Sequence, residues 1–244
     1  TMLPPKPWQA ERVAWLLVAF LAANLLGMMV VQGYSSALSK EEVKQPINVL
    51  VMLAGTLMYQ GVTLVLIGVF LRMHRMTWPE AFGFTTKRIA RTLGLAALAT
   101  ALILPITMAL GEVSKLILEG MGQRPQLQET VQALKSTETL QQQIYFAIVT
   151  IFVAPFVEEV MFRGILYPSF KHLGYPKFAL WSTSIFFAVS HVNAVAFIPL
   201  LFMAVILTFL YETTENLIAP IVTHALFNAT NFAWLLHRMA EGGS

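Results

Sequence analysis

Two adjacent glutamates, Glu158 and Glu159, lie in a stretch of otherwise mostly apolar residues between positions 144 and 170. A carboxylate in the hydrocarbon of a membrane costs roughly 2.5 to 3.5 kcal/mol even on lenient insertion scales, so such residues usually mark a functional site. Successive residues of a helix are separated by about 100°, so the two side chains point to different faces. The sequence therefore predicts a different role for each glutamate.

The second glutamate has a partner one helical turn away. Glu159 precedes Arg163 by four residues, which is the favoured order and spacing for an ion pair on one helix face. Glu158 then has no local partner, and a carboxyl group in that position can accept and donate a proton. Pro155 cannot donate a hydrogen bond to the carbonyl of Ile151, so it can bend the helix and admit water. A plainer interpretation is also open, in which the three charged residues only tie helices together.

Two other polar pairs occur at helical spacing further along the chain. Phe187 and His191 are four residues apart in one apolar block, and His224 and Asn228 are four apart in the last block, so each pair shares a helix face. A single histidine or asparagine in a membrane is often only a weak link between helices. Together with Glu158, however, these side chains supply a base, a second imidazole and hydrogen-bond donors. Those are the groups needed to activate water and stabilise an oxyanion.

The composition indicates what kind of element must position these residues. Of the 244 residues, 57% are hydrophobic and only 12% are charged, and the mean hydropathy is +0.66. An ordinary soluble domain has about a quarter of its residues charged. The sequence therefore predicts an all-α membrane protein with the polar residues around a cavity within its helix bundle. Apolar blocks and short polar joints alternate without a linker or a repeat, so we expect a single domain over residues 1–244.

The apolar blocks predict about seven transmembrane helices. Roughly 20 apolar residues are needed to cross the hydrocarbon, and the first half of the chain divides more clearly than the second. A mixed polar segment at 112–143 predicts an amphipathic helix that lies on the membrane surface. The net charge of +3 comes without a basic cluster interleaved with aromatic residues, so we expect no nucleic-acid partner. The predicted spans are 13–31, 47–71, 89–110, 144–167, 178–191, 195–211 and 217–236.

Three motifs in the second half of the chain resemble those of a known family. The runs EEVMFR (158–163), FAVSH (187–191) and HALFN (224–228) are similar to the EExxxR, FxxxH and HxxxN motifs of the CAAX protease and bacteriocin-processing (CPBP, or Abi) intramembrane proteases. The resemblance covers about residues 144–236, the motif-bearing core. The run WPEAFGF (78–84) is also similar to a loop often seen upstream in bacterial members.

The resemblance implies a glutamate-dependent intramembrane endopeptidase. In the family, the first glutamate acts with the histidine of the second motif to activate water, and the histidine and asparagine of the third motif form the oxyanion site. Glu159 and Arg163 would be supporting residues. The residues that would take the catalytic roles are Glu158, His191, His224 and Asn228.

Other classes of membrane protease lack their required residues here. The chain contains no aspartate, so neither an aspartyl protease nor a Ser-His-Asp site can be formed. None of its histidines is followed by glutamate, so there is no HExxH zinc motif. Ser190 has no GxSx context and points about 100° away from His191, which disfavours a Ser-His dyad.

A metal site and two other functions stay open as alternatives. Zinc could be held by Glu158, His191 and His224, although we expect catalysis without a cofactor. A catalytically inactive regulator or bacteriocin-immunity protein would use the same polar residues to bind a membrane segment of a partner. A proton-coupled transporter usually shows inverted repeats, which we do not find. We expect the protein in a bacterial-type inner (cytoplasmic) membrane, with the lipid bilayer and a membrane-anchored protein or peptide substrate as its partners.

Overall fold

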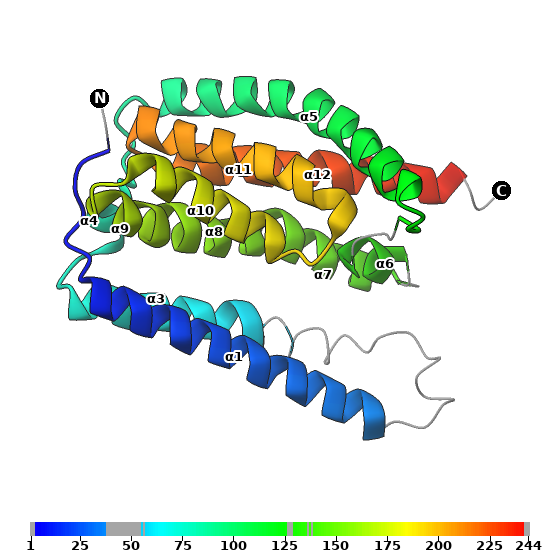
Figure 1. Ribbon diagram of the computed structural model, residues 1–244, viewed down its shortest axis with the longest axis horizontal. Helices are drawn as coiled ribbons and strands as arrows, with labels where there is room; N and C mark the ends of the chain where they lie inside the picture. The colour runs from blue at the N-terminus through cyan, green and yellow to red at the C-terminus, as the bar shows by residue number, and fades with distance from the viewer. Residues whose placement is uncertain are drawn as a thin grey trace.

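The fold is helical throughout the part of the chain that can be described. The computed structural model describes residues 3–37, 55, 57–125, 129–135, 137 and 139–241, and within them it has no strand. The prediction of an all-α protein is confirmed (Figure 1). With η marking a π-helical turn, the elements are α1 (Ala10–Ala37), η2 (Leu57–Gly61), α3 (Val62–Met73), α4 (Trp78–Phe82), α5 (Ile89–Gly120), α6 (Glu129–Lys135), α7 (Leu140–Ile148), η3 (Val149–Val153), α8 (Ala154–Glu159), η4 (Val160–Leu166), α9 (Tyr167–His172), α10 (Pro176–Val189), α11 (Ala194–Thr214) and α12 (Ile218–Glu241).

Four of these helices are long and apolar enough to cross a membrane, so the protein is a multi-pass membrane protein. They are the first part of α1, α5, the continuous helix Leu140–His172 and α11, and Met58–Met73 is a shorter apolar helix. Each predicted span overlaps a helix, although 47–54 of the second span lie outside the described residues. With 14 residues, α10 is about 21 Å long. The number of seven crossings stays a prediction.

The predicted surface helix at 112–143 differs from the structure at its start. Because α5 continues without interruption to Gly120, residues 112–120 belong to a long apolar helix and not to a separate surface element. Only the short α6 and the beginning of α7 fall in the rest of the segment. Its residues 126–128, 136 and 138 are outside the described part of the chain.

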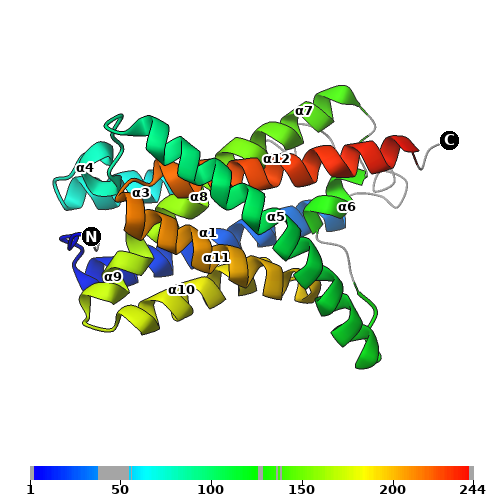
Figure 2. The same ribbon diagram turned by 90° about the horizontal axis from the view of Figure 1, so that it is seen from above.

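The core is a bundle of α5, α10, α11, α12 and the helix Leu140–His172. α11 packs against α5 and α10, and α12 packs against α5, the π-turn η3 and the short helix α8. The two views of the ribbon show α12 and α11 together beneath α5, with the helix Leu140–His172 on their other side (Figure 1, Figure 2). This arrangement places the second and third motifs on helices that surround the first.

The helices α1 and α3 form a hairpin that is joined to the core mainly at one end. α1 packs on α3, and the hairpin lies apart from the bundle in Figure 1. The segment before α1 contacts both the hairpin and the bundle. Trp8 packs against Phe70 of the hairpin with ring centroids 5.1 Å apart, and its Nε1 donates a hydrogen bond to the carbonyl of Gly164 in the bundle at 3.2 Å. The backbone N–H of Leu3 donates to Glu212 at 2.9 Å. This segment therefore fixes the hairpin to the end of the bundle.

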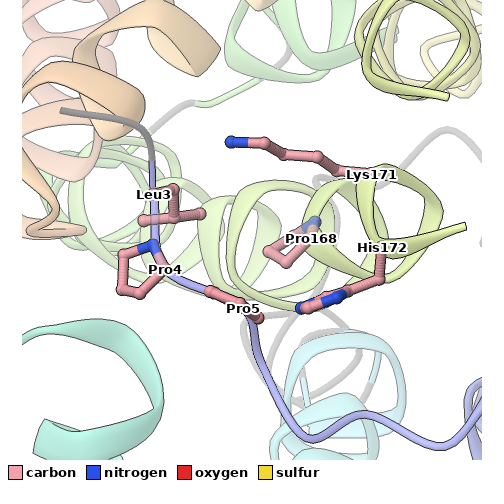
Figure 3. A pocket seen from close by; sticks show the side chains of 6 residues that line it. All are labelled: Leu3, Pro4, Pro5, Pro168, Lys171 and His172. Atoms are coloured by element: carbon pink, nitrogen blue, oxygen red, sulfur yellow. The ribbon is translucent and has the colours of Figure 1, made fainter. Parts of the chain in front are cut away.

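A cavity of about 220 Å³ lies beside this N-terminal segment (Figure 3). It is lined by Leu3, Pro4 and Pro5 from the segment and by Pro168, Lys171 and His172 from α9. None of the residues predicted to carry chemistry lines this cavity. Glu212 pairs with Lys171 and accepts a hydrogen bond from the Tyr167 hydroxyl at 2.7 Å, so the charges at this end are used in holding helices together.

The short helix α4 is anchored against the helix that carries the glutamates. Its start is fixed by Glu80, whose Oε2 accepts hydrogen bonds from the Thr77 hydroxyl at 2.7 Å and the Thr77 backbone at 2.9 Å. These hydrogen bonds hold the pKa of Glu80 below its ordinary value. At its other end, Phe82 packs against Gly164, where an added Cβ would lie 2.7 Å from the phenyl ring. The WPEAFGF run is therefore a clamp on η4 rather than a free loop.

Candidate active site

The two glutamates lie on a single helix whose hydrogen bonding is altered on both sides of them. The π-turn η3 precedes α8, and the π-turn η4 follows it. In η3, the backbone N–H of Ala154 donates to the carbonyl of Val149, five residues back. In that register the next donor would serve Thr150, but it is Pro155, which has no N–H. π-turns often occur at functional sites, and here one lies on each side of the short helix that carries both glutamates.

The carbonyl that Pro155 leaves free has a partner on another helix. The side-chain amide of Asn228, on α12, donates to the carbonyl of Thr150 at 2.8 Å. A buried carbonyl without a partner is costly, so this hydrogen bond stabilises the irregular turn. Asn228 is thus partly occupied in supporting the backbone, and it makes no hydrogen bond to either glutamate among the described residues. Its second N–H is the one that can face a substrate.

The ion pair predicted from the four-residue spacing is confirmed. Arg163 Nη1 lies 2.8 Å from Glu159 Oε1, and the side chains are 2% and 0% exposed. The guanidinium also donates to the carbonyl of Ala204 on α11 at 3.1 Å, and its Cζ lies 4.5 Å from the ring centre of Phe187 on α10. Arg163 therefore connects the motif helix to both of the helices that follow it.

His224 bridges the two glutamates. Its Nδ1 lies 2.9 Å from Glu159 Oε1, and its Nε2 lies 3.9 Å from Glu158 Oε2. A carboxylate at Nδ1 favours the tautomer with its proton on that nitrogen. With Nδ1 held by Glu159, the other ring nitrogen, Nε2, faces Glu158. Glu159 therefore does more than balance Arg163, because it also orients the imidazole of His224.

Glu158 is the carboxylate that is not neutralised. Its side chain is 19% exposed, whereas that of Glu159 is fully buried. Its Oε2 is shielded from solvent and has no hydrogen-bond partner in the described part of the chain. The cluster contains two carboxyl groups and one guanidinium, which pairs with Glu159, so the cluster is neutral only with one further proton. That proton can reside on Glu158 Oε2 or on His224 Nε2.

His191 lies just beyond the end of α10 and next to the cluster, but not in it. Its Nδ1 is 2.8 Å from the carbonyl of Phe187, which leaves Nε2 available. The buried ring of Phe187 neighbours both imidazoles, with ring centroids 4.8 Å from His191 and 5.8 Å from His224. No hydrogen bond or ion pair joins His191 to Glu158 or Glu159 within the described residues. Substrate or water is needed to connect them.

The structure therefore brings together part of the predicted set. Glu159, Arg163 and His224 form one hydrogen-bonded cluster, Glu158 lies 3.9 Å from His224 without a hydrogen bond to it, and His191 and Asn228 lie at the margin. The carbonyls of Thr150 and Ala204 were missed by sequence reasoning, because a backbone acceptor leaves no mark on residue type. Among the described residues, no three His or Glu side chains meet as a metal-binding group.

These observations define a class: a multi-pass helical membrane protein with a cluster of ionisable side chains buried in its core. Residues 140–230 match the family model described as "Type II CAAX prenyl endopeptidase Rce1-like", a segment that contains all six predicted site residues. This segment is therefore similar to the Rce1-like proteases of the CPBP family, and the match bears out the resemblance inferred from the three motifs. No curated protein and no solved structure matched the chain.

Proposed function

We propose that the protein is an intramembrane endopeptidase that uses Glu158 to activate water against a peptide bond. The observation that carries this proposal is the unpartnered, solvent-shielded Oε2 of Glu158, 3.9 Å from the imidazole of His224. Glu159 Oε2 also lacks a hydrogen-bond partner among the described residues, but Glu159 is fully buried and its other oxygen is held by Arg163 and His224, whereas the side chain of Glu158 is 19% exposed and can reach water. A group kept unpaired in such a site is suited to hold a water molecule.

The reaction would proceed by general acid–base catalysis. Glu158 accepts a proton from the bound water as the oxygen attacks the substrate carbonyl, and it later donates this proton to the leaving amine. His191 holds the water from the other side through its free Nε2. His224 and Asn228 donate to the developing oxyanion, and Glu159 keeps His224 in the required orientation. In these steps the one extra proton of the cluster resides on His224 Nε2, which donates it as a hydrogen bond to the oxyanion, and Glu158 begins ionised and carries the proton taken from water to the leaving amine.

The substrate class follows from where the cluster lies. The motif residues are on helices of the membrane-embedded core, so the scissile bond must enter from a membrane-associated protein or peptide. The bilayer is therefore a partner of the reaction, and we place the protein in a bacterial-type inner membrane. We propose water activation without a metal. If zinc bound to Glu158, His191 and His224 instead, a chelator would abolish cleavage and added zinc would restore it.

The test is cleavage of lipid-anchored and unanchored reporter peptides by the purified protein in detergent. Glu158→Gln and His191→Ala are expected to lose cleavage. Glu112→Gln is the matched control, because Glu112 lies on the exposed surface of α5, and it is expected to cleave like the wild type. Equal cleavage by Glu158→Gln and the wild type would refute the proposal. Absence of cleavage by every form, with retained binding of a membrane segment, would favour the inactive regulator or immunity protein.

A further inference from the structure

Positive charges gather at one end of the helix bundle. The N-terminal segment, residues 3–9, marks this end, because its backbone N–H groups donate to Glu212 near the end of α11, to His172 at the end of α9 and to His74 after α3. Figure 1 places the N-terminus, α4, α9 and the start of α5 there. Six exposed cations lie in these helix ends and the loops between them, and within the described residues none of them is in an ion pair. They are Arg72, Arg75, Lys87, Arg88, Arg91 and Lys177.

The opposite end of the bundle has no such excess. Its described residues, 112–125, 129–135 and 237–241, contain as many Glu as Lys and Arg. There Lys115 pairs with Glu112 at 2.6 Å. Membrane proteins carry their excess of Lys and Arg on the cytoplasmic side, where the leaflet is rich in anionic lipids. The asymmetry therefore favours an orientation in which the cation-rich end faces an anionic membrane surface.

The cavity beside the N-terminal segment lies at this cation-rich end. Its volume of about 220 Å³ is far more than one water molecule needs. The residues that line it from the N-terminal segment are apolar, and Lys171 and His172 of α9 supply its polar side chains. Figure 3 shows the Lys171 side chain extended across the cavity. Because Pro4, Pro5 and His172 are exposed, a ligand can reach the cavity from outside.

Both polar side chains of the cavity present hydrogen-bond donors. Lys171 pairs with Glu212, which uses one of the three N–H groups of the ammonium. Nε2 of His172 accepts the backbone N–H of Lys6, so the proton of the neutral imidazole lies on Nδ1, from which it can be donated. Glu212 does not line the cavity, and it accepts two further hydrogen bonds from within the protein. The polar side of the cavity therefore suits an anion.

We propose that this cavity binds the phosphate of an anionic phospholipid, with Lys171 and His172 as the donors to its oxygens. Lysine commonly binds phosphate as a point charge. The proline walls suit the carbon atoms that join the phosphate to the acyl chains, and the six surrounding cations attract anionic lipid to this end. The lipid then contacts both the N-terminal segment and α9, and it strengthens the junction between the hairpin and the core. This inference does not depend on peptide cleavage.

The first test counts the lipids that stay bound in native mass spectrometry. After incubation in micelles with equal amounts of phosphatidylglycerol and phosphatidylcholine, the wild type is expected to retain one phosphatidylglycerol. Lys171→Met and His172→Phe should each bind it about tenfold more weakly, as for the loss of a hydrogen bond to a charged group. Lys115→Met, at the opposite end, is the control and should bind it like the wild type.

Two outcomes of this test would overturn the proposal. The first is equal retention of the two lipids by the wild type. The second is unchanged binding in Lys171→Met and His172→Phe together with a loss in the double variant Lys87→Gln, Arg88→Gln, because the exposed cations alone would then hold the lipid.

The second test measures how much each ligand raises the melting temperature in detergent. A ligand that binds only the folded state raises it, so phosphatidylglycerol should stabilise the wild type more than it stabilises His172→Phe or Lys171→Met. The increase is compared within each variant, because Lys171→Met also loses its ion pair with Glu212. Equal increases in all three proteins would overturn the proposal. An equal increase from inorganic phosphate would show a site for free anions and overturn the lipid assignment.

Discussion

Replacing Arg163 with methionine removes the only guanidinium from the buried cluster and tests the ion pair that organises it. Glu159 would be left 0% exposed with no cation, and the hydrogen bond to the carbonyl of Ala204 would be lost. Breaking a buried pair from one side costs about 3 to 5 kcal/mol, because the remaining charge cannot reach water. His224 still contacts the same carboxylate oxygen, so we expect a loss of about 3 kcal/mol, the lower end of that range.

The free energy of unfolding can be followed by SDS titration in mixed micelles. The matched control is Lys115→Met, which breaks an ion pair to Glu112 of similar length, 2.6 Å, whose side chains are 44% and 70% exposed. An exposed pair of this kind contributes at most about 1 kcal/mol. In both variants methionine replaces the cation of an ion pair with glutamate, and the two pairs differ strongly in burial. Their difference therefore measures what burial adds to the ion pair.

A double variant separates the unpaired charge from lost packing. In Glu159→Gln with Arg163→Met, neither charge remains, so we expect the double variant to be more stable than the sum of the two single losses predicts. The reasoning would be refuted if Arg163→Met lost no more stability than Lys115→Met. It would also be refuted if the two single losses simply added, because the loss would then not come from an unpaired charge.

Three further predictions concern Glu159, the contact between α4 and Gly164, and the hydrogen bonds of Glu80 at the start of α4. Glu159→Gln removes the charge that orients His224, so kcat should fall roughly 100-fold while the protein stays folded. Gly164→Ala puts a methyl group 2.7 Å from the ring of Phe82 and should lower the free energy of unfolding by about 1 to 3 kcal/mol. Because the pKa of Glu80 is lowered in the folded protein, its contribution to stability is present at neutral pH and is lost as pH falls through that lowered value. Glu80→Gln should therefore lower the melting temperature at pH 7, with the difference disappearing in acid.

Two of these predictions have a comparison variant on the same chain. Gly111→Ala in α5 meets nothing within 4 Å, so it should be neutral or slightly stabilising, and equal losses at Gly111 and Gly164 would contradict the close contact at α4. Thr77→Ala removes a hydrogen-bond donor to Glu80 and should reproduce the acid dependence of Glu80→Gln. A difference that persists unchanged in acid would show that the Glu80 carboxylate is not the cause. For Glu159→Gln, wild-type kcat would contradict the role in orienting His224.

The part of the site that lies on one helix could be predicted from the sequence. The Glu159–Arg163 pair follows from a four-residue spacing, which fixes both side chains on one face whatever the rest of the chain does. The helices follow from apolar composition, because a membrane-spanning segment needs about 20 apolar residues. The resemblance of the three motifs to one family could be recognised for a related reason, since each motif is a run of only five or six consecutive residues.

The contacts between helices could not be predicted in the same way. Which glutamate receives His224 depends on the height and rotation of α12 against α8, and hydropathy constrains neither. The expected four-residue pairing of Phe187 and His191 within a helix was also only partly right, because α10 ends at Val189 and His191 lies just after it. The last turn of a helix is weakly specified by composition, since its end depends on packing and on the connecting loop.

Pro155 explains how α12 acquires its register, and with it the geometry of the site. The π-turn before Pro155 leaves the carbonyl of Thr150 without an internal donor, and Asn228 supplies one. Four residues earlier on α12, and so on the same face, His224 meets Glu159. Two contacts on one face hold α12 in both height and rotation against the glutamate helix. The asparagine of the third motif therefore helps to position the histidine of that motif, through a hydrogen bond to the carbonyl that Pro155 leaves without a donor.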